Sequence, residues 1–306
     1  MTMSANLSSA LSALRAGKLV GMPTETVYGL AGDATNPKAV AAIYALKQRP
    51  SFNPLIAHIA SIEMAQDQAR FSPTALKLSR AFWPGPMTLV LPVSDTNTVC
   101  DLARAGLETQ ALRWPRHELA QQLISDFGKP IVAPSANKSG KVSPTQPEHV
   151  REEFGDELPI ILDGGPSVLG LESTVLFVED DKVTLLRPGS LARRDIEALV
   201  GPIQSALHDD TAPKSPGMLS RHYAPKAKLR LNAASPEADE TYLGFGRSFD
   251  HGPHSLSRSG DLQEAASNLY AMLRDLDEIS DKIAIAPIPD EGLGEAINDR
   301  LKRASL

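Results

Sequence analysis

The stretch P-T-E-T-V-Y-G-L (residues 23–30) follows a short apolar segment, L-V-G-M (residues 19–22), near the start of the chain. The apolar segment predicts a buried strand that ends at Pro23, and the polar residues after it predict a loop. Two hydroxyls, a carboxylate and a phenol stand close to Gly29. Such residues also make ordinary turns whose polar side chains satisfy one another, so residue chemistry alone leaves a functional and a structural interpretation open.

Outward from this loop, helical and strand patterns alternate. Before it, Leu7, Leu11 and Leu14 have the spacing of an amphipathic helix. After it, helices are predicted over residues 37–47, 63–69, 73–82 and 117–127, and strands over 54–59, 87–91, 110–114, 130–133, 160–162, 174–178 and 183–186. The last two strands are close enough in sequence to form a hairpin. This alternation predicts an α/β fold built on a twisted mixed sheet.

The composition changes after residue 200. Residues 201–227 are rich in proline and glycine and show little periodicity, which predicts a linker. Beyond it, strands are predicted over residues 228–231, 241–245 and 282–286, with helices over 262–279 and 294–303. We therefore expect a first domain (1–200), a linker or lid (201–227) and a smaller, Rossmann-like α/β domain (228–306).

Composition narrows the possible functions. The 306 residues suit two domains, and the formal net charge of -6 weighs against a protein whose main partner is a nucleic-acid backbone. A single cysteine, Cys100, excludes an intrachain disulfide and a cysteine-rich zinc site and fits a reducing compartment. No apolar run approaches the ~20 residues of a membrane span. We expect a cytoplasmic protein that does not bind membranes.

Common nucleotide-binding and hydrolase motifs are absent from the sequence. There is no G-x-x-x-x-G-K-[ST], no complete G-x-G-x-x-G, no H-E-x-x-H and no G-x-S-x-G. If the protein uses a nucleotide, it must bind it by a less common route.

Cations and small polar side chains nevertheless follow several predicted strands, where open α/β sheets bind their ligands. Lys47 ends a helix, whose negative pole alone could explain a lysine there. Arg49 lies between proline-stiffened turns and suits a phosphate or carboxylate. Arg113 lies in an apolar strand, so it needs either an internal carboxylate or an anionic ligand. His58, also in an apolar strand, fits a hydrogen-bonded core residue equally well.

Further polar loops follow later in the chain. P-S-A-N-K-S-G (134–140) can form a nest of backbone N–H groups for an anion, or an ordinary loop. E-S-T (172–174), R-P-G (187–189) and R-H-Y-A-P (221–225) add hydroxyls, cations and aromatic side chains. Together these loops predict a pocket for an anionic small molecule, without a cluster of metal ligands.

The same motifs, in order, resemble the YrdC-like family. They are P-T-E-T-V-Y-G-L, K-Q-R-P with N-P-L-I-A-H-I, W-P-G-P-M-T-L, P-S-A-N-K-S-G, E-S-T-V and L-R-P-G-S. The linker S-P-G-M-L-S-R-H-Y-A-P and the ending G-L-G-E-A-I-N-D-R-L-K-R-A resemble the longer, two-domain threonylcarbamoyl-AMP synthases of that family. The resemblance covers nearly the whole chain.

This resemblance implies a reaction that joins L-threonine, bicarbonate and ATP into threonylcarbamoyl-AMP and releases pyrophosphate. The adenylate would serve threonylcarbamoyl-adenosine formation in tRNA, through a downstream tRNA threonylcarbamoyl-transfer complex. Mg2+ would accompany ATP, and no stable binding of nucleic acid would be required. Such chemistry needs positioning and charge neutralisation rather than a protein nucleophile.

The resemblance also implies roles for individual residues. L-Threonine would be held by Thr24, His58, Arg113 and Ser173. ATP would be held by Lys47, Arg49, Asn53, Ser135, Asn137, Ser143, Arg187, His222 and Tyr223. Of these, Lys47, Arg49, Ser135 and Asn137 would act in catalysis, His222 and Tyr223 would close over the site, and no side chain would bind a metal.

Three other functions remain open from the sequence. The first is a non-catalytic module of the same fold that binds tRNA or double-stranded RNA. The second is an enzyme of the same class with a different carbamoyl acceptor. The third is a regulator that binds its ligand without turnover.

Overall fold

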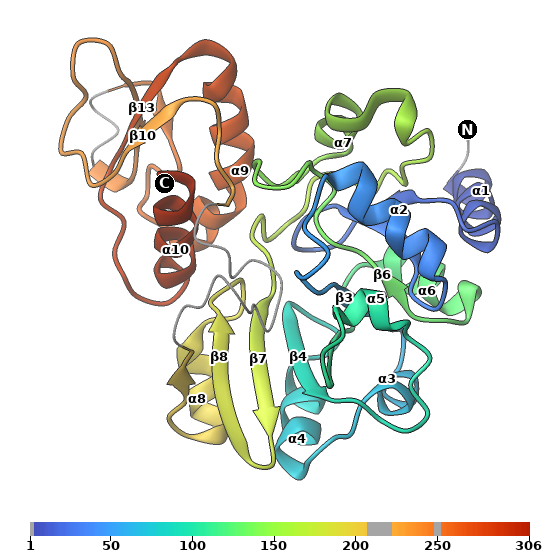
Figure 1. The fold of residues 1–306 in the computed structure, drawn as a ribbon. Coiled ribbons are helices and arrows are strands. Elements are labelled where there is room, and N and C mark those ends of the chain that lie inside the picture. Colours follow the sequence, from blue (N-terminus) through green and yellow to red (C-terminus); the bar gives the residue numbers. More distant parts are fainter. Residues whose placement is uncertain (1–2, 207–221, 248–251) are drawn as a thin grey trace.

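The computed structural model describes residues 3–206, 222–247 and 252–306, and these residues form two sheets (Figure 1). Residues 207–221, most of the predicted linker, lie outside the described part of the chain. The larger sheet has nine strands between residues 20 and 205, so its last strand lies in the first residues of the predicted linker, and the smaller has four strands between residues 228 and 285. The predicted α/β fold with a second, smaller α/β unit is confirmed.

The larger sheet has the strand order β1-β2-β6-β3-β5-β4-β7-β8-β9. Its strands are β1 (Val20–Met22), β2 (Gly29–Asp33), β3 (Ile56–His58), β4 (Met87–Pro92), β5 (Thr109–Arg113), β6 (Ile131–Val132), β7 (Thr174–Glu179), β8 (Lys182–Arg187) and β9 (Gln204–Ser205). The pairs β3/β5 and β4/β7 are parallel, whereas β4/β5 and β7/β8 are antiparallel, so the sheet is mixed as predicted.

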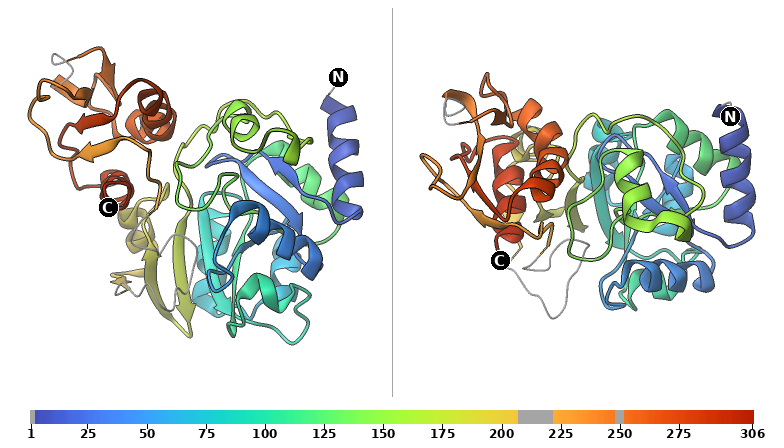
Figure 2. Two further views of the ribbon diagram at one scale, coloured as in Figure 1. Left: turned by 45° about the horizontal axis from the view of Figure 1, so that its top comes forward. Right: turned by 90° about the horizontal axis from the view of Figure 1, so that it is seen from above.

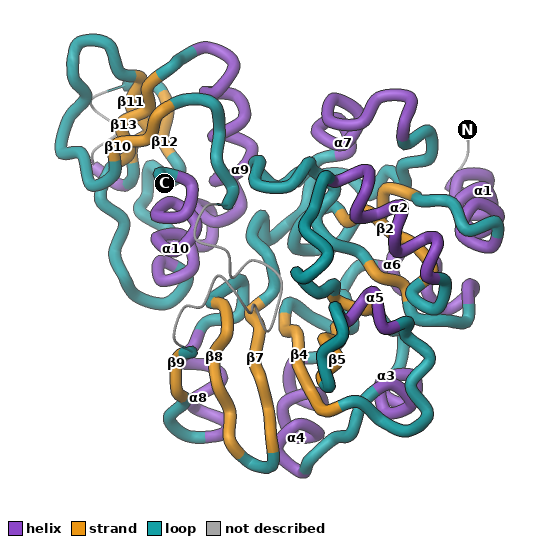
Figure 3. The backbone as a smooth tube through the Cα atoms, in the orientation of Figure 1, coloured by secondary structure: helices purple, strands orange, loops and turns teal. Residues whose placement is uncertain are grey.

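Helices pack on this sheet and between its connections (Figure 3). They are α1 (Met3–Arg15), α2 (Pro37–Lys47), α3 (Ile62–Gln68), α4 (Pro73–Phe82), α5 (Asp101–Arg104), α6 (Glu118–Phe127), α7 (Pro147–Phe154), the 3-10 helix η1 (Gly155–Glu157) and α8 (Arg193–Val200). The start of α2 shows why these residues form a helix. Asn36 accepts a hydrogen bond from Lys38 N, and Pro37 occupies the first turn, where its missing N–H is not needed.

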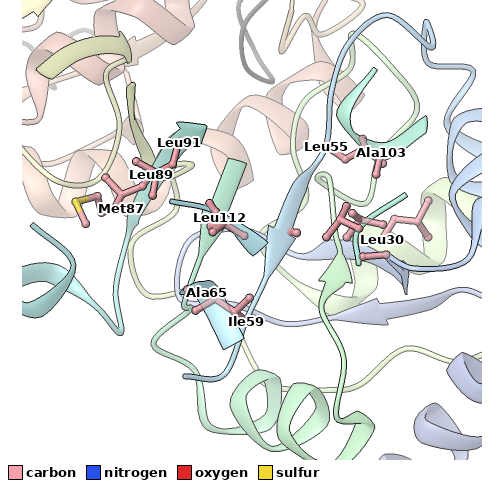
Figure 4. Packing of buried hydrophobic residues seen from close by; sticks show 14 of the residues in the cluster. Leu30, Leu55, Ile59, Ala65, Met87, Leu89, Leu91, Ala103 and Leu112 are labelled. Atoms are coloured by element: carbon pink, nitrogen blue, oxygen red, sulfur yellow. The ribbon is translucent and has the colours of Figure 1, made fainter. Parts of the chain in front are cut away.

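Alternation along the central strands builds two apolar surfaces. Leu89, Leu91 and Leu112 face the main core, together with Leu30, Leu55 and other buried side chains (Figure 4). Their neighbours Val90 and Ala111 belong to a second cluster on the opposite face. Since both faces of β4 and β5 are buried, the middle of the sheet is a rigid base for the loops at its edge.

The smaller sheet is entirely parallel in the order β10-β13-β11-β12. Its elements are β10 (Lys228–Arg230), β11 (Thr241–Gly244), β12 (His254–Ser255), β13 (Lys282–Ile285), α9 (Leu262–Ile279) and α10 (Gly294–Ala304). Figure 2 shows this unit as a separate lobe beside the larger one. Among the described helices, none is long and apolar enough to cross a membrane.

The strand predicted over residues 160–162 is wrong. A single bridge pairs Gly21 with Ile161, and the N–H of Gly21 donates to the carbonyl of Ile160. The segment lies beside β1 for one residue pair only, between Pro159 and a turn at Asp163, which is too short for a ladder.

Candidate active site

Eight of the predicted site residues line one cavity of about 50 Å3 at the edge of the larger sheet. They are Arg49, His58, Arg113, Ser135, Ser173, Arg187, His222 and Tyr223. The cavity wall also includes Thr26, Val27, Ile56, Ala133, Pro134 and Glu172. Thr26 and Glu172 were not among the predicted site residues, although both belong to loops that the sequence marks as polar.

Strand register brings these residues together. His58 and Arg113 are direct partners at the ends of the parallel strands β3 and β5. Because β7 and β8 are antiparallel, the end of β8 meets the start of β7, and an N–H of Arg187 donates to the carbonyl of Ser173 at 2.9 Å. A Cβ on Gly189 would lie 2.4 Å from the carbonyl oxygen of Glu172, so the turn after β8 requires glycine for its close approach.

Arg113 has the internal carboxylate partner that the sequence left open. Its Nη2 lies 2.8 Å from Oε2 of Glu25, and both side chains are buried. Its Nε donates to the carbonyl of Gly85 at 3.4 Å. Since Arg113 lines the cavity and Glu25 does not, Glu25 lies behind the guanidinium and fixes how it faces the cavity.

The two predicted cations after α2 differ in their surroundings. Lys47 is buried, and its Nζ donates to the carbonyls of Ser135 and Asn137, which ties the 134–140 loop to the helix. Burial, and then the charge of Arg49, lower the pKa of Lys47 well below its ordinary value. Arg49 donates to the carbonyls of Asn53 and Pro54, and burial lowers its pKa to about 10, so it keeps its charge at neutral pH.

Several buried polar atoms around the cavity have no hydrogen-bond partner among the described residues. These atoms are Nδ1 of His58, Nδ1 of His222, the hydroxyl of Tyr223 and both amide atoms of Asn53. A buried polar atom without a partner is costly, which favours a ligand that supplies the missing bonds. Burial lowers the pKa of both histidines to about 3, so each ring is neutral and can accept as well as donate.

The remaining predicted residues surround the cavity without lining it. The hydroxyl of Thr24 donates to the carbonyl of Val27 at 2.7 Å and lies 2.8 Å from the Thr26 hydroxyl. The amide of Asn137 donates to two carbonyls of its own loop. The hydroxyl of Ser143 donates to Glu172 at 2.6 Å.

No group of three or more His, Cys, Asp or Glu side chains that could hold a metal ion occurs in the part of the chain that the structure describes. Glu172 in the cavity wall is paired with Arg300, and Glu25 is paired with the wall residue Arg113. The donor set therefore does not fit a resident metal ion.

A larger cavity of about 900 Å3 lies between α7 and α9. Its wall carries Glu152, Glu153, Asp275, Asp277 and Glu278, against the cations Lys141, Lys226 and Arg274. None of the predicted site residues lines it. An anionic ligand is disfavoured beside so many carboxylates, so we take the smaller, cationic cavity as the candidate active site despite its size.

Fold and cavity together define an α/β protein with a buried cationic pocket for an anionic small molecule. The family described as "Telomere recombination" (Sua5_yciO_yrdC) matches residues 12–189, and "Threonylcarbamoyl-AMP synthase, C-terminal domain" (Sua5_C) matches residues 191–305. The chain belongs to the Sua5/YciO/YrdC family in its two-domain form.

Similar proteins cover almost the whole chain. The threonylcarbamoyl-AMP synthase of Bacillus subtilis is 43% identical over 98% of this chain and 92% of its own length. That of Pyrococcus abyssi is 41% identical over 95% of this chain and 92% of its own length. A crystal structure of P. abyssi Sua5 complexed with L-threonine superposes with a TM-score of 0.90 at 38% identity, covering 100% of this chain and 95% of that one.

Proposed function

We propose that this protein synthesises threonylcarbamoyl-AMP from L-threonine, bicarbonate and ATP. The threonine amine adds to bicarbonate-derived CO2 and loses a proton, which gives a carbamate. A carbamate oxygen then attacks the α-phosphorus of ATP, and pyrophosphate leaves. The observation that carries the proposal is the buried cavity with Arg49, Arg113 and Arg187 in its wall, in a chain that is similar over nearly its full length to enzymes of that name.

We propose that threonine binds on the side of the cavity formed by β3 and β5. Arg113 would bind the carboxylate, oriented from behind by Glu25. His58, neutral and with Nδ1 unpartnered in the described structure, would meet the amine or hydroxyl. Thr24 and Ser173 complete the set predicted from the sequence, Ser173 in the wall and Thr24 behind Thr26.

We propose that ATP binds on the side of the cavity formed by the 134–140 loop and the end of β8. Arg49 and Arg187 supply charge for the phosphates, and Ser135 is also in the wall. Lys47 and Asn137 hold that loop in shape, and Asn53 has unsatisfied amide atoms for a nucleotide. Ser143 reaches the site through its bond to Glu172. His222 and Tyr223 form a lid in the cavity wall that would keep water from the anhydride.

Mg2+ would arrive with the nucleotide. Mg2+ in nucleotide sites is commonly held by phosphate oxygens and water with only one or two protein carboxylates. The pairing of Glu25 and Glu172 with arginines is consistent with an ion carried by the triphosphate.

We further propose a cytoplasmic enzyme whose product passes to a tRNA threonylcarbamoyl-transfer complex. The mixed anhydride it makes is readily hydrolysed, which favours prompt transfer to that next enzyme. The domain boundaries at residues 200 and 228 stay predictions.

The test is pyrophosphate release by the purified chain with threonine and bicarbonate omitted in turn. We expect release only when threonine, bicarbonate and MgATP are all present. Release without threonine would contradict the threonine assignment. ATP binding without any release, in folded protein, would indicate a binding module instead.

A further inference from the structure

Residues of the smaller domain contact the wall of the candidate active site from outside the cavity. Arg300 on α10 has an exposed fraction of 1%, and its Nε donates to Oε2 of Glu172 at 2.8 Å. Its Nη2 donates to the carbonyl of Pro188 at 2.9 Å, in the turn after β8. Glu172 lines the cavity. One arginine of the smaller domain therefore contacts two loops of the larger domain, and Figure 1 shows α10 near the end of β8.

The same arginine contacts the lid. The guanidinium carbon of Arg300 lies 5.0 Å from the ring centroid of Tyr223, within the range of a cation–π contact. Tyr270 on α9 stacks on Tyr223 with ring centroids 5.7 Å apart, and its hydroxyl donates to Glu172 at 2.9 Å. Two helices of the smaller domain thus meet the lid and the cavity wall at once.

Apolar packing extends these contacts across the domain boundary. Val27, Val142 and Leu171 of the larger domain share a cluster with Tyr223 and with the buried face of α9. The lid backbone is also held from both sides. His222 N donates to the carbonyl of Arg303 at 3.3 Å, and Ala224 N donates to the carbonyl of Gly140 at 2.8 Å.

The lid conformation is one that the chain would not adopt unaided. Tyr223 has φ 63°, in the left-handed region that bulky side chains disfavour. Such a conformation persists only when its surroundings over-determine it. Here the surroundings are Tyr270, Arg300 and the two backbone bonds.

The lid is closed in this structure. The cavity beneath it is about 50 Å3, whereas pockets for ligands of drug size are roughly 300–1,000 Å3. Part of the cavity wall must therefore move to admit ATP, and Tyr223 in that wall is contacted by Arg300.

We propose that Arg300 is a positioning residue, which holds Tyr223 and Glu172 in their closed places, so that the smaller domain completes the active site around bound nucleotide. This inference rests on the proposed function and deepens it. It assigns the smaller domain a part in nucleotide retention, through two side chains, Arg300 and Tyr270, that lie outside the catalytic sheet.

Kinetics of the full-length Arg300→Met variant test the proposal. Loss of a charged hydrogen bond and of the cation–π contact should raise KM for ATP by about ten-fold or more. KM for threonine should rise less, because Arg113 is held by Glu25 and not by Arg300 or Glu172. Arg300→Lys should recover part of the loss. Tyr270→Phe, which keeps the ring stack and removes one hydroxyl, should raise KM for ATP by about two- to five-fold.

Lys302→Met is the matched control, since Lys302 is an exposed cation on the same helix. It should match the wild type. A purely structural role would lower the thermal midpoint of Arg300→Met and leave both KM values unchanged, which would overturn the proposal. If Arg300→Met does not fold, Tyr270→Phe and Arg300→Lys decide, and wild-type KM for ATP in both would overturn it. A wild-type protein that releases no pyrophosphate would instead overturn the proposed function.

Discussion

Two buried carboxylate–arginine pairs flank the candidate active site, and they are built in opposite senses. Glu25–Arg113 lies within the larger domain, with the arginine facing the cavity and the carboxylate behind it. Glu172–Arg300 joins the two domains, with the carboxylate facing the cavity and the arginine behind it. Both have a closest N···O distance of 2.8 Å. The first pair presents a cation to a ligand, and the second fixes the wall and the lid around it.

The largest effect is expected from breaking the second pair. Glu172→Ala removes one of the two carboxylates that contact the buried Arg300, while Asp299 stays in place. This should lower the free energy of unfolding by about 3 kcal/mol, the low end for a broken buried ion pair. Urea denaturation measures this loss. The double variant Glu172→Ala/Arg300→Met removes both charges and should recover part of the stability. A double variant with the full sum of two single losses would show that the pair is not coupled.

Replacing Arg113, the member of the Glu25–Arg113 pair that faces the cavity, tests the threonine site. Arg113→Ala should raise KM for threonine by at least about 100-fold, because the buried cation assigned to its carboxylate is lost. The fold should survive when Glu25→Gln is added to remove the stranded charge. Steady-state pyrophosphate release gives both KM values. Normal threonine kinetics in the folded double variant would contradict the assignment.

The buried carboxylate Glu172 and the buried histidines His58 and His222 should affect folding stability in different pH ranges. Burial raises the pKa of Glu172, but Arg300 and Arg187 outweigh it and lower the pKa to about 2. The stability from this carboxylate is therefore full above its ordinary pKa near 4.5 and is lost only as the pH falls towards about 2. His58 and His222 have folded pKa values of about 3, below the ordinary 6.5, so the unfolded chain takes up protons first.

Between pH 7.5 and 5.5 the loss of folding stability should therefore come from His58 and His222. Each should lower the free energy of unfolding by up to about 1.4 kcal/mol at pH 5.5. Urea titrations at the two pH values measure the loss, and His58→Gln should reduce it. A stability that is flat over this range would contradict buried neutral histidines.

The smallest effect is expected from Glu25→Gln, which tests whether Glu25 orients Arg113. Glu25→Gln keeps the shape and removes the charge behind Arg113, so the guanidinium loses part of its orientation. We expect a rise of about three- to ten-fold in KM for threonine, with little change in KM for ATP. An equal rise in both values would indicate a general disturbance of the site.

Local signals predicted much of the fold. The helix at 37–47 has a capping asparagine, a first-turn proline and apolar spacing, and the structure shows α2 with the same bounds. The hairpin of β7 and β8 follows from two apolar runs with a short acidic turn. Weak patterns were missed. α8 is short and mostly polar, although Ile196, Leu199 and Val200 have helical spacing. The glycine-rich β2 is buried along its whole length, so it shows no alternation.

The candidate site was predicted unevenly for a similar reason. The wall residues follow predicted strands, so their loops could be named from the sequence. The partners that fix them could not. Arg300 is 128 positions from Glu172, and no local pattern links an arginine in a polar helix to a carboxylate in an earlier loop. Tyr270 is 98 positions from Glu172, and its helical spacing indicates a core residue.

The most direct test identifies the product made with 13C-labelled bicarbonate. Wild-type protein, L-threonine, MgATP and labelled bicarbonate should yield an adenylate whose mass contains threonine, one labelled carbonyl carbon and AMP. Mass spectrometry of a rapidly quenched reaction measures this. A threonine adenylate without the labelled carbon, or AMP that forms without threonine, would contradict the account.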